Sequence, residues 1–422
     1  MNTGTMLAEA RRQTDKLFDL VRPDSLYERP IAERHRIVFY LGHIEAFDWN
    51  LLRPHMRDIE AFDARLDRLF AFGIDPVSGG LPSDVPSDWP RVDEIRAYNR
   101  RVRDTLDDAE HERLLLHMAL EHRLMHAETL AYMLHQLPLD RKQAESQALV
   151  PASEPVHRET IEIPDGCATL GLEHGGAFGW DNEFDAHRVA VPAFAIDRHK
   201  VTNVDYLEFI EAGGYADRSL WTGAAWQWKE DAGVAYPVFW KKANGGWLYR
   251  TMFDEIPLPL DWPVYVSHAE AAAYARWAGG RLPAEPEWQR AAYGTPEGSE
   301  RLFPWGDQQP DLSRGFFDFA RWDPAPVNAF PCARSAFNVD GLLANGWEWT
   351  STVFAPFAGF AAHPGYRGYS ADFFDGRHFV LKGGSARTAA CMLRRSFRNW
   401  FQPHYQYVYA GFRCVNRGAE EV

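Results

Sequence analysis

The chain is poor in cysteine. Its 422 residues include four, and no two of them form a CxxC pair: Cys167, Cys332, Cys391 and Cys414. Disulfide frameworks of small secreted domains and zinc knuckles both need closely spaced cysteines. Neither class of protein is therefore indicated.

Clustered positive charge and long apolar runs are also missing. Lys and Arg number 45 against 59 Asp and Glu, which gives a formal net charge of -14. Phosphate backbones are bound by clustered Lys and Arg, so we do not expect a nucleic-acid partner. No apolar run reaches the roughly 18 residues of a membrane span, and residues 1–18 lack the apolar core of a signal peptide. We expect a cytoplasmic protein with no membrane partner; the sequence predicts no particular oligomeric state.

The composition is that of a globular protein, with 46% hydrophobic and 25% charged residues, and the length favours two domains. The first 140 residues carry apolar side chains at helical spacing in four segments: 6–21, 33–56, 93–107 and 114–137. One long loop, 72–90, is rich in Gly, Pro, Ser and Asp. Four such helices predict an antiparallel four-helix bundle.

A linker is expected at residues 141–160, where helical periodicity gives way to Pro, Ser and charge. Residues 161–422 are richer in Gly and Trp and carry frequent turn signals. The pattern there predicts short strands and short helices, the strands at 161–171, 188–203 and 379–387 and the helices at 201–215 and 267–280. The predicted fold class is α+β.

Two histidines, His122 and His126, stand four residues apart in the helix predicted at 114–137. At this spacing both imidazoles leave the same helix face, so they can reach one metal ion. His43 is the natural third ligand, since it lies on a strongly apolar helix where an unpaired polar ring is costly. Taken alone, each histidine is better explained by a structural role, the pair as surface composition and His43 as a buried, hydrogen-bonded ring.

Five blocks in the second half resemble the formylglycine-generating-enzyme-like domain, a variant of the C-type-lectin fold. They are VTNVDYLEFI (201–210), PVYVSHAEAAAYARWAGGRLPAEPEWQRAA (263–292), FPWGD (303–307), NVDGLLANGWEWT (338–350) and LKGGSARTAACMLRRSFRNW (381–400) followed by AGFRC. Most of these residues are expected to be scaffold, with Gly where backbones approach closely and Trp in crowded layers.

The first half resembles a DinB-like helical bundle, and the two halves together resemble the iron-dependent sulfoxide synthases of ergothioneine biosynthesis. The resemblance implies that His43 in LGH and His122 and His126 in HRLMHAE bind the metal, with Glu128 supporting them. Three neutral imidazoles suit Fe(II) and leave open coordination positions. Zinc fits the same ligands, so the choice of Fe(II) comes from the resemblance.

The same resemblance implies a reaction in which O₂ drives the joining of hercynine, which is trimethylhistidine, to a thiol. Asn399 and Trp400 match a family pair that contacts the betaine part of hercynine. An aromatic face attracts a quaternary ammonium and an amide can hydrogen-bond a carboxylate, although Trp400 is also one of 16 tryptophans and fits a core role. Tyr366 and Tyr369, in YRGYSADFFDG, are the candidates for the catalytic tyrosine that donates a proton or hydrogen bond near the iron.

Three positions depart from the family pattern. Met125 replaces a glutamine common in the mycobacterial type, while Phe401 and Tyr405 replace an Asp and an Arg of the enzymes that use γ-glutamylcysteine. Losing both charges removes groups suited to a dipeptide's carboxylate and amine, which favours free cysteine as the sulfur donor. Arg398 remains as a carboxylate partner, with Arg394 and Arg395 beside it in sequence.

Two other functions stay open. One is a selenoneine synthase, which joins hercynine to a selenosugar and differs only in the donor pocket. The other is a non-catalytic binding module in which the lectin-like domain holds a ligand. A formylglycine-generating oxidase is disfavoured, because those enzymes bind copper with a close cysteine pair and Cys391 and Cys414 are 23 positions apart.

Overall fold

A computed structural model describes residues 3–72, 81–145, 147–148, 150, 156–343 and 345–416. The chain divides into two compact units, Met1–Ser146 and Gln147–Val422, and each is described by itself. Parts of the loop expected at 72–90 and of the linker expected at 141–160 lie outside the described residues.

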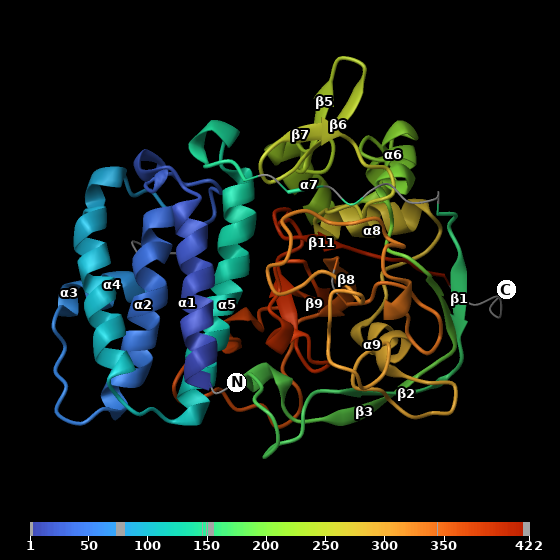
Figure 1. The fold of residues 1–422 in the computed structure, drawn as a ribbon. Helices are drawn as coiled ribbons and strands as arrows, with labels where there is room; N and C mark the ends of the chain where they lie inside the picture. The colour runs from blue at the N-terminus through green and yellow to red at the C-terminus, as the bar shows by residue number, and fades with distance from the viewer. Residues whose placement is uncertain are drawn as a thin grey trace. The chain divides into compact units, whose positions relative to one another are not determined.

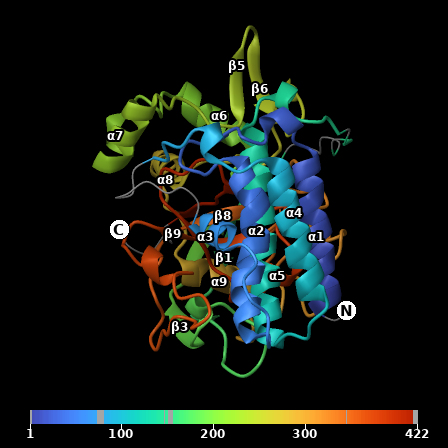
Figure 2. The ribbon, with the colours of Figure 1, turned by 90° about the vertical axis from the view of Figure 1, so that its left-hand side faces the viewer.

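Helices make up the first unit (Figures 1 and 2). They are α1 (Thr3–Asp19), α2 (Ile37–Leu52), α3 (Ala64–Phe72), α4 (Val92–Asp107) and α5 (Arg113–Gln136). The sequence did not predict α3, which is a short helix packed on α2. Almost every residue of α2 is buried, which matches its apolar sequence. Helix α5 ends where Leu137 takes an extended conformation before Pro138, as residues before proline prefer.

The expectation of a fully antiparallel bundle is wrong. Asn99 on α4 bonds the carbonyl of Leu41 on α2, and one turn later Arg103 bonds Glu45, so α2 and α4 run parallel. Helices α1 and α5 are also parallel, since the residues just after them meet in a bond from the Gln143 amide to Leu20. Helix α4 therefore starts at the same end of the bundle as α2, and residues 53–91 join the end of α2 to the start of α4.

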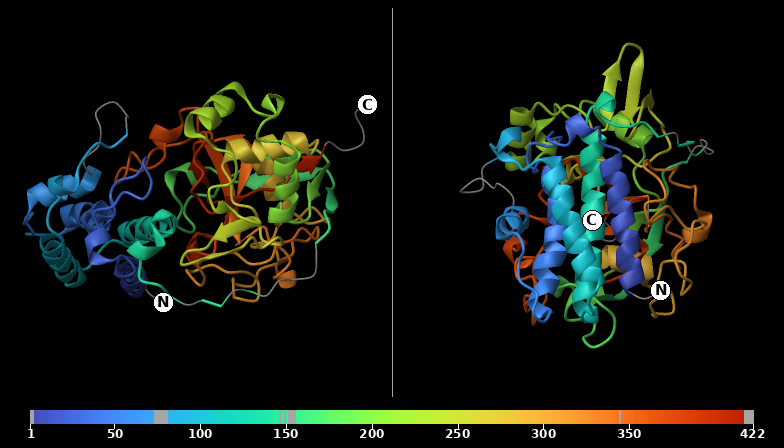
Figure 3. Two further views of the ribbon diagram at one scale, coloured as in Figure 1. Left: turned by 90° about the horizontal axis from the view of Figure 1, so that it is seen from above. Right: turned by 60° about the vertical axis from the view of Figure 1, so that its left-hand side comes forward.

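The second unit is built around a four-stranded sheet in the order β10-β9-β8-β11. Figure 3 gives two further views of the ribbon. Its strands are β8 (Gly346–Val353), β9 (Phe379–Gly384), β10 (Asn399–Phe401) and β11 (Ala410–Gly411). Strand β11 joins β8 in parallel, and the other neighbours are antiparallel.

Three smaller sheets complete the strand content that the structure describes: β1-β4-β12, β2-β3 and β5-β6-β7. Their bounds are β1 (Thr160–Ile163), β2 (Gly166–Leu170), β3 (His187–Val191), β4 (Phe194–Asp197), β5 (Trp240–Ala243), β6 (Gly246–Arg250), β7 (Glu255–Pro257) and β12 (Val415–Asn416). Four α-helices accompany them: α6 (Asn203–Glu211), α7 (Gly223–Ala232), α8 (His268–Trp277) and α9 (Glu285–Tyr293). The α+β class is confirmed.

Two of the expected strands are each divided in the structure. Pro164 separates β1 from β2, and Pro192 separates β3 from β4, so each pair of strands joins different sheets. Proline lacks the amide hydrogen that a ladder needs, which explains the breaks. Among the described residues, no helix is long and apolar enough to cross a membrane.

Candidate functional site

Three histidines converge inside the first unit. His43 on α2 faces His122 and His126 on the antiparallel α5, and one nitrogen from each ring lies within 4.8 Å of the others. The Nε2 atoms of His43 and His126 are 3.2 Å apart. The ring centroids lie 5.2 Å apart for His43 and His122, 4.7 Å apart for His43 and His126, and 4.5 Å apart for His122 and His126. The structure thus brings together all three residues that the sequence named as metal ligands.

All three imidazoles are neutral at pH 7. Burial lowers the pKa of His43 to about 4 and holds the pKa values of His122 and His126 well below their ordinary value. His43 and His122 are buried, and His126 is half-buried. Neutral imidazole nitrogens are metal donors, since no proton has to leave before an ion binds.

A backbone carbonyl orients His43. Its Nδ1 lies 2.6 Å from the carbonyl oxygen of Phe70 on α3. A carbonyl only accepts, so Nδ1 must carry the proton and Nε2 is left with its lone pair toward the other two histidines. Metal-binding histidines are typically oriented by such a bond to their second nitrogen.

Helix α3 is itself held by α2 and α4. The Asp67 carboxylate accepts bonds from Trp49 Nε1 at 3.3 Å and from the Tyr98 hydroxyl at 2.7 Å. Gly42 permits the close approach, because a Cβ there would lie 2.5 Å from the Phe70 ring. The glycine of the LGH motif therefore admits the helix that orients the neighbouring histidine.

Aromatic rings cover the imidazoles. Phe47 stacks on His122 with centroids 3.4 Å apart and planes inclined by 11°, and Phe39 stacks on His43 at 4.7 Å. The Tyr40 ring lies 5.7 Å from that of His126. The stacked rings of Phe39 and Phe47 each cover one face of an imidazole and keep water from that face.

A buried charge network fixes α5 against α2. Arg123, which follows His122, is fully buried and bonds Glu45 at 2.8 Å and Asp48 at 2.6 Å. Burial opposes ionisation of Glu45, but Arg123 and Arg103 outweigh it and lower the pKa of Glu45 to about 2. The sequence analysis did not predict this network. The signal that could have indicated it is the presence of opposite charges on two otherwise apolar helices.

The histidine cluster fits a divalent ion. Its three nitrogen ligands are neutral and converge from two helices, and three ligands leave further coordination positions open. Borderline metals such as iron and zinc accept a ligand set of this kind. Glu128 is buried but is not part of the converging set found among the described residues.

In the second unit, three candidate residues share one aromatic cluster. Trp400 on β10 stacks on Phe354 at 4.2 Å, and the Tyr369 ring approaches Trp400 at 5.3 Å with planes inclined by 81°. Tyr366 lies 5.7 Å from Tyr369, and burial raises the pKa of its phenol. Phe373 adds a further ring 5.6 Å from Trp400.

The other candidate residues differ in their contacts. Arg398 is 2% exposed and donates to Glu285 at 3.0 Å and to the carbonyl of Ala355, contacts that favour a structural role. Asn399 is half-buried beside Trp400, and its side-chain oxygen accepts the Trp400 amide. Substrate binding by either residue stays a prediction.

Phe401 and Tyr405, the two positions that depart from the family pattern, stack on each other. Their centroids lie 5.2 Å apart and their planes are inclined by 8°. In place of two opposite charges the chain thus has an aromatic pair. Met125 is half-buried on α5 between the two histidines.

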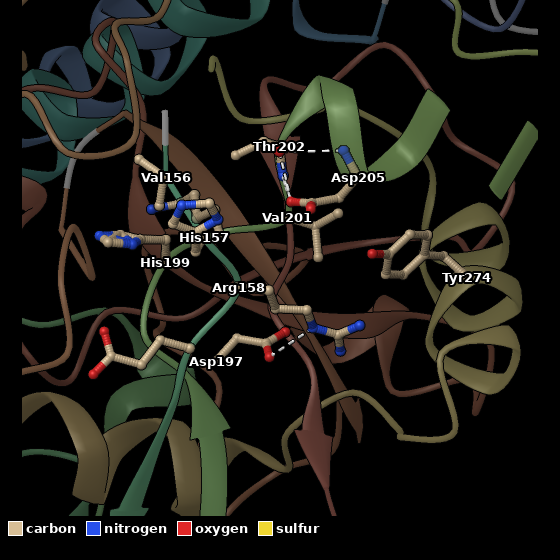
Figure 4. Close-up of a pocket in the computed structure, with 11 residues that line it drawn as sticks. Val156, His157, Arg158, Asp197, His199, Val201, Thr202, Asp205 and Tyr274 are labelled. Atoms are coloured by element: carbon tan, nitrogen blue, oxygen red, sulfur yellow. Dashed lines mark hydrogen bonds and ion pairs between the residues drawn. The ribbon is translucent and has the colours of Figure 1, made fainter. Parts of the chain in front are cut away.

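A polar pocket in the second unit has charged walls but little room (Figure 4). Its volume is about 20 Å³, enough for about one water molecule. Arg158 pairs with Asp197, and Asp205 caps helix α6 by accepting from Thr202. These side chains contact one another, so we assign the pocket no ligand.

Comparison with known proteins gives one domain match and several relatives. Residues 146–418 match the sulfatase-modifying factor enzyme 1-like domain, which confirms the expected domain type. The hercynine oxygenase of Mycolicibacterium smegmatis is 37% identical over 418 residues, covering 92% of this chain and 95% of the relative. That of Mycobacterium tuberculosis is 42% identical over 238 residues, covering 56% and 55%. Ergothioneine biosynthesis protein 1 of Neurospora crassa is 28% identical, covering 93% of this chain and 55% of the relative.

Proposed function

The chain belongs to the hercynine oxygenase family, and from this premise we propose that it is an Fe(II)- and O₂-dependent sulfoxide synthase of ergothioneine biosynthesis. The observation that carries the proposal is the convergence of His43, His122 and His126 within 4.8 Å. The proposed substrates are hercynine, free cysteine and O₂.

The three histidines are the proposed metal ligands. Fe(II) bound there would supply one-electron chemistry toward O₂ and hold the thiol sulfur as a thiolate. The protein's part is to keep the nitrogens unprotonated by burial, to orient His43 through the Phe70 carbonyl, and to hold α5 against α2 through Arg123. The aromatic rings of Phe39 and Phe47 exclude water from the imidazoles.

The overall reaction balances without a further co-reactant. The imidazole C–H and the thiol S–H bonds break, a C–S and an S=O bond form, and the second oxygen atom leaves as water. O₂ takes up the four electrons that these two oxidations release. A proton must reach an oxygen atom along the way, and the phenol of Tyr366 or Tyr369 is the proposed donor.

The aromatic cluster is the proposed site for the trimethylammonium group. Trp400, Tyr369 and Phe373 present rings at different inclinations, an arrangement that suits a quaternary ammonium. Asn399 is the proposed partner of the substrate carboxylate. The stacked Phe401 and Tyr405 leave no charged pair for a dipeptide at these two positions, which favours cysteine over γ-glutamylcysteine.

The proposal is tested by anaerobic loading with Fe(II) followed by O₂ uptake and product mass analysis with hercynine. Cysteine, γ-glutamylcysteine and a selenosugar are compared as donors. Cysteine should give the sulfoxide with one O₂ consumed per product. Preference for the selenosugar would indicate the selenoneine synthase instead. No turnover with any donor, together with ligand binding that survives His43→Ala, would identify a binding module and refute the proposal.

A further inference from the structure

The helical unit has a cavity separate from the histidine cluster. It lies between α1, α2 and α4, measures about 200 Å³, and is lined by Asp15, Phe18, Asp19, Leu41, Arg96, Asn99, Arg100 and Arg103. Leu41 is two residues before His43, so the two side chains leave nearly opposite faces of α2. The cavity therefore opens on a different side of α2 from the candidate metal centre.

The apolar part of the cavity comes from Phe18 and Leu41, which are 5% and 7% exposed. A cavity of about 150 Å³ lined by apolar side chains is known to accept benzene, so this one has room for a single ring and a small polar group.

The charges around the cavity are unevenly paired. Arg103 is bonded to Asp15 and Glu45, so its charge is already paired within the protein. Arg96 and Arg100, one turn apart on α4, are exposed and make no ion pair or hydrogen bond within the described part of the chain. Asp19, across the cavity on α1, has no such partner there either.

Asn99 also lines the cavity. Its Nδ2 donates to the Leu41 carbonyl at 2.8 Å, which fixes the orientation of the amide. The opposite atom, Oδ1, is buried and accepts no hydrogen bond from any residue that the structure describes. Because Oδ1 has no exposed surface, a ligand in the cavity does not reach it, and Asn99 contributes no hydrogen bond to a ligand.

We propose that this cavity binds a small amino acid that carries one ring. The carboxylate binds Arg96 and Arg100, the ammonium group binds Asp19, and the ring packs on Phe18 and Leu41. Guanidinium groups bind carboxylates through paired hydrogen bonds, which makes the arginine pair the anion-binding half. The inference does not depend on the proposed oxygenase function.

The test uses the metal-free full chain and L-phenylalanine, a probe without a metal-binding side chain, with Kd measured by saturation-transfer NMR. Joint replacement Arg96→Gln and Arg100→Gln should raise Kd at least about tenfold, since it removes the charge-assisted hydrogen bonds to the carboxylate of the probe. The matched control, Arg57→Gln with Arg68→Gln, changes the same charge on exposed arginines outside the cavity and should leave Kd unchanged. No binding by the native chain, or an equal Kd in both double variants, would overturn the proposal.

A second comparison isolates the ammonium group. 3-Phenylpropanoate, which lacks it, should bind the native chain more weakly than L-phenylalanine, and Asp19→Asn should remove that difference. Trp400→Ala should leave the affinity for L-phenylalanine unchanged. Loss of binding in Trp400→Ala but not in the Arg96 and Arg100 variant would place the probe at the aromatic cluster and refute the cavity site.

Discussion

Replacing Gly42 by alanine should weaken metal binding without touching any ligand. The new Cβ would lie 2.5 Å from three atoms of the Phe70 ring, whereas ordinary contact begins at 3.4 Å. Phe70 is 0% exposed, so its ring has no free space to enter. The overlap is relieved only by moving α3 away from α2, and this lengthens the bond from His43 Nδ1 to the Phe70 carbonyl.

Two magnitudes follow. Overpacking of a buried contact costs about 1–3 kcal/mol of unfolding free energy. Loss of the bond that orients a metal-binding histidine lowers metal affinity about 10- to 100-fold. Gly→Ala within a helix is otherwise stabilising by about 0.5–1 kcal/mol, so the predicted change has the opposite sign from the intrinsic preference.

Metal affinity is measured by competition with a chromophoric chelator, and stability by urea unfolding of the metal-free chain. Gly223→Ala is the matched control, because a Cβ there meets nothing within 4 Å and both properties should stay unchanged or improve slightly. Adding Phe70→Leu to Gly42→Ala should restore part of the affinity by making room. Native affinity in Gly42→Ala, or a loss that Phe70→Leu does not relieve, would refute the role given to α3.

Four further predictions concern other residues. His126→Ala should abolish stoichiometric metal binding, which elemental analysis after dialysis would detect. Trp400→Ala should keep the metal but raise the Kd for hercynine about 2- to 30-fold by calorimetry, since a cation–π contact contributes about 0.5–2 kcal/mol. Arg123→Met should cost about 3–5 kcal/mol in urea unfolding, because it leaves the buried Asp48 carboxylate without its cation and leaves Glu45 paired with Arg103 alone. Burial opposes ionisation of Glu183, but Arg394 outweighs burial and holds the pKa of Glu183 below its ordinary value. The stabilisation from this ionised carboxylate is therefore present at neutral pH and is lost as pH falls through the lowered pKa. Glu183→Gln should flatten the acid side of the stability–pH curve.

Each of the four has an outcome that counts against it. Native metal content in His126→Ala would remove that residue from the ligand set. Unchanged hercynine affinity in Trp400→Ala would show that Trp400 has only a structural role. Metal loss in the same variant would contradict a role limited to substrate binding. Unfolding free energy within about 1 kcal/mol of native in Arg123→Met would show that the charge network contributes little. If Glu183→Gln left the acid side of the stability–pH curve unchanged, other carboxylates would control the loss of stability at low pH.

Local sequence signals predicted the long helices but not the way in which these helices are connected. The apolar segments around His43 and His126 are long and uninterrupted, so their helical state follows from periodicity. The parallel arrangement of α2 and α4 depends on where the connection from 53 to 91 returns, and loop length does not specify that. Strand β11 has two residues and pairs with β8 more than fifty positions earlier, which periodicity cannot detect.

The same division holds at the candidate site. Spacing and apolar context named His122, His126 and His43 as candidates, because ligands on regular helices keep a fixed period, but the family resemblance was needed to prefer a metal site over a structural role. The carbonyl of Phe70 was out of reach, since a backbone atom leaves no residue-type signal and α3 spans only nine residues. The aromatic cluster around Trp400 was only partly foreseen, because Phe354, which follows β8, is remote from Trp400 in sequence, and nothing distinguished Phe373 within YRGYSADFFDG.

The central claim is that three imidazoles from α2 and α5 bind one ion. X-ray absorption of the Fe(II)-loaded chain, with metal content measured on the same sample, tests it most directly. One iron per chain with three imidazole nitrogens among its ligands is the predicted result, together with loss of that spectrum in His43→Ala. An iron whose ligands are mainly oxygen, or a spectrum that His43→Ala leaves unchanged, would contradict it.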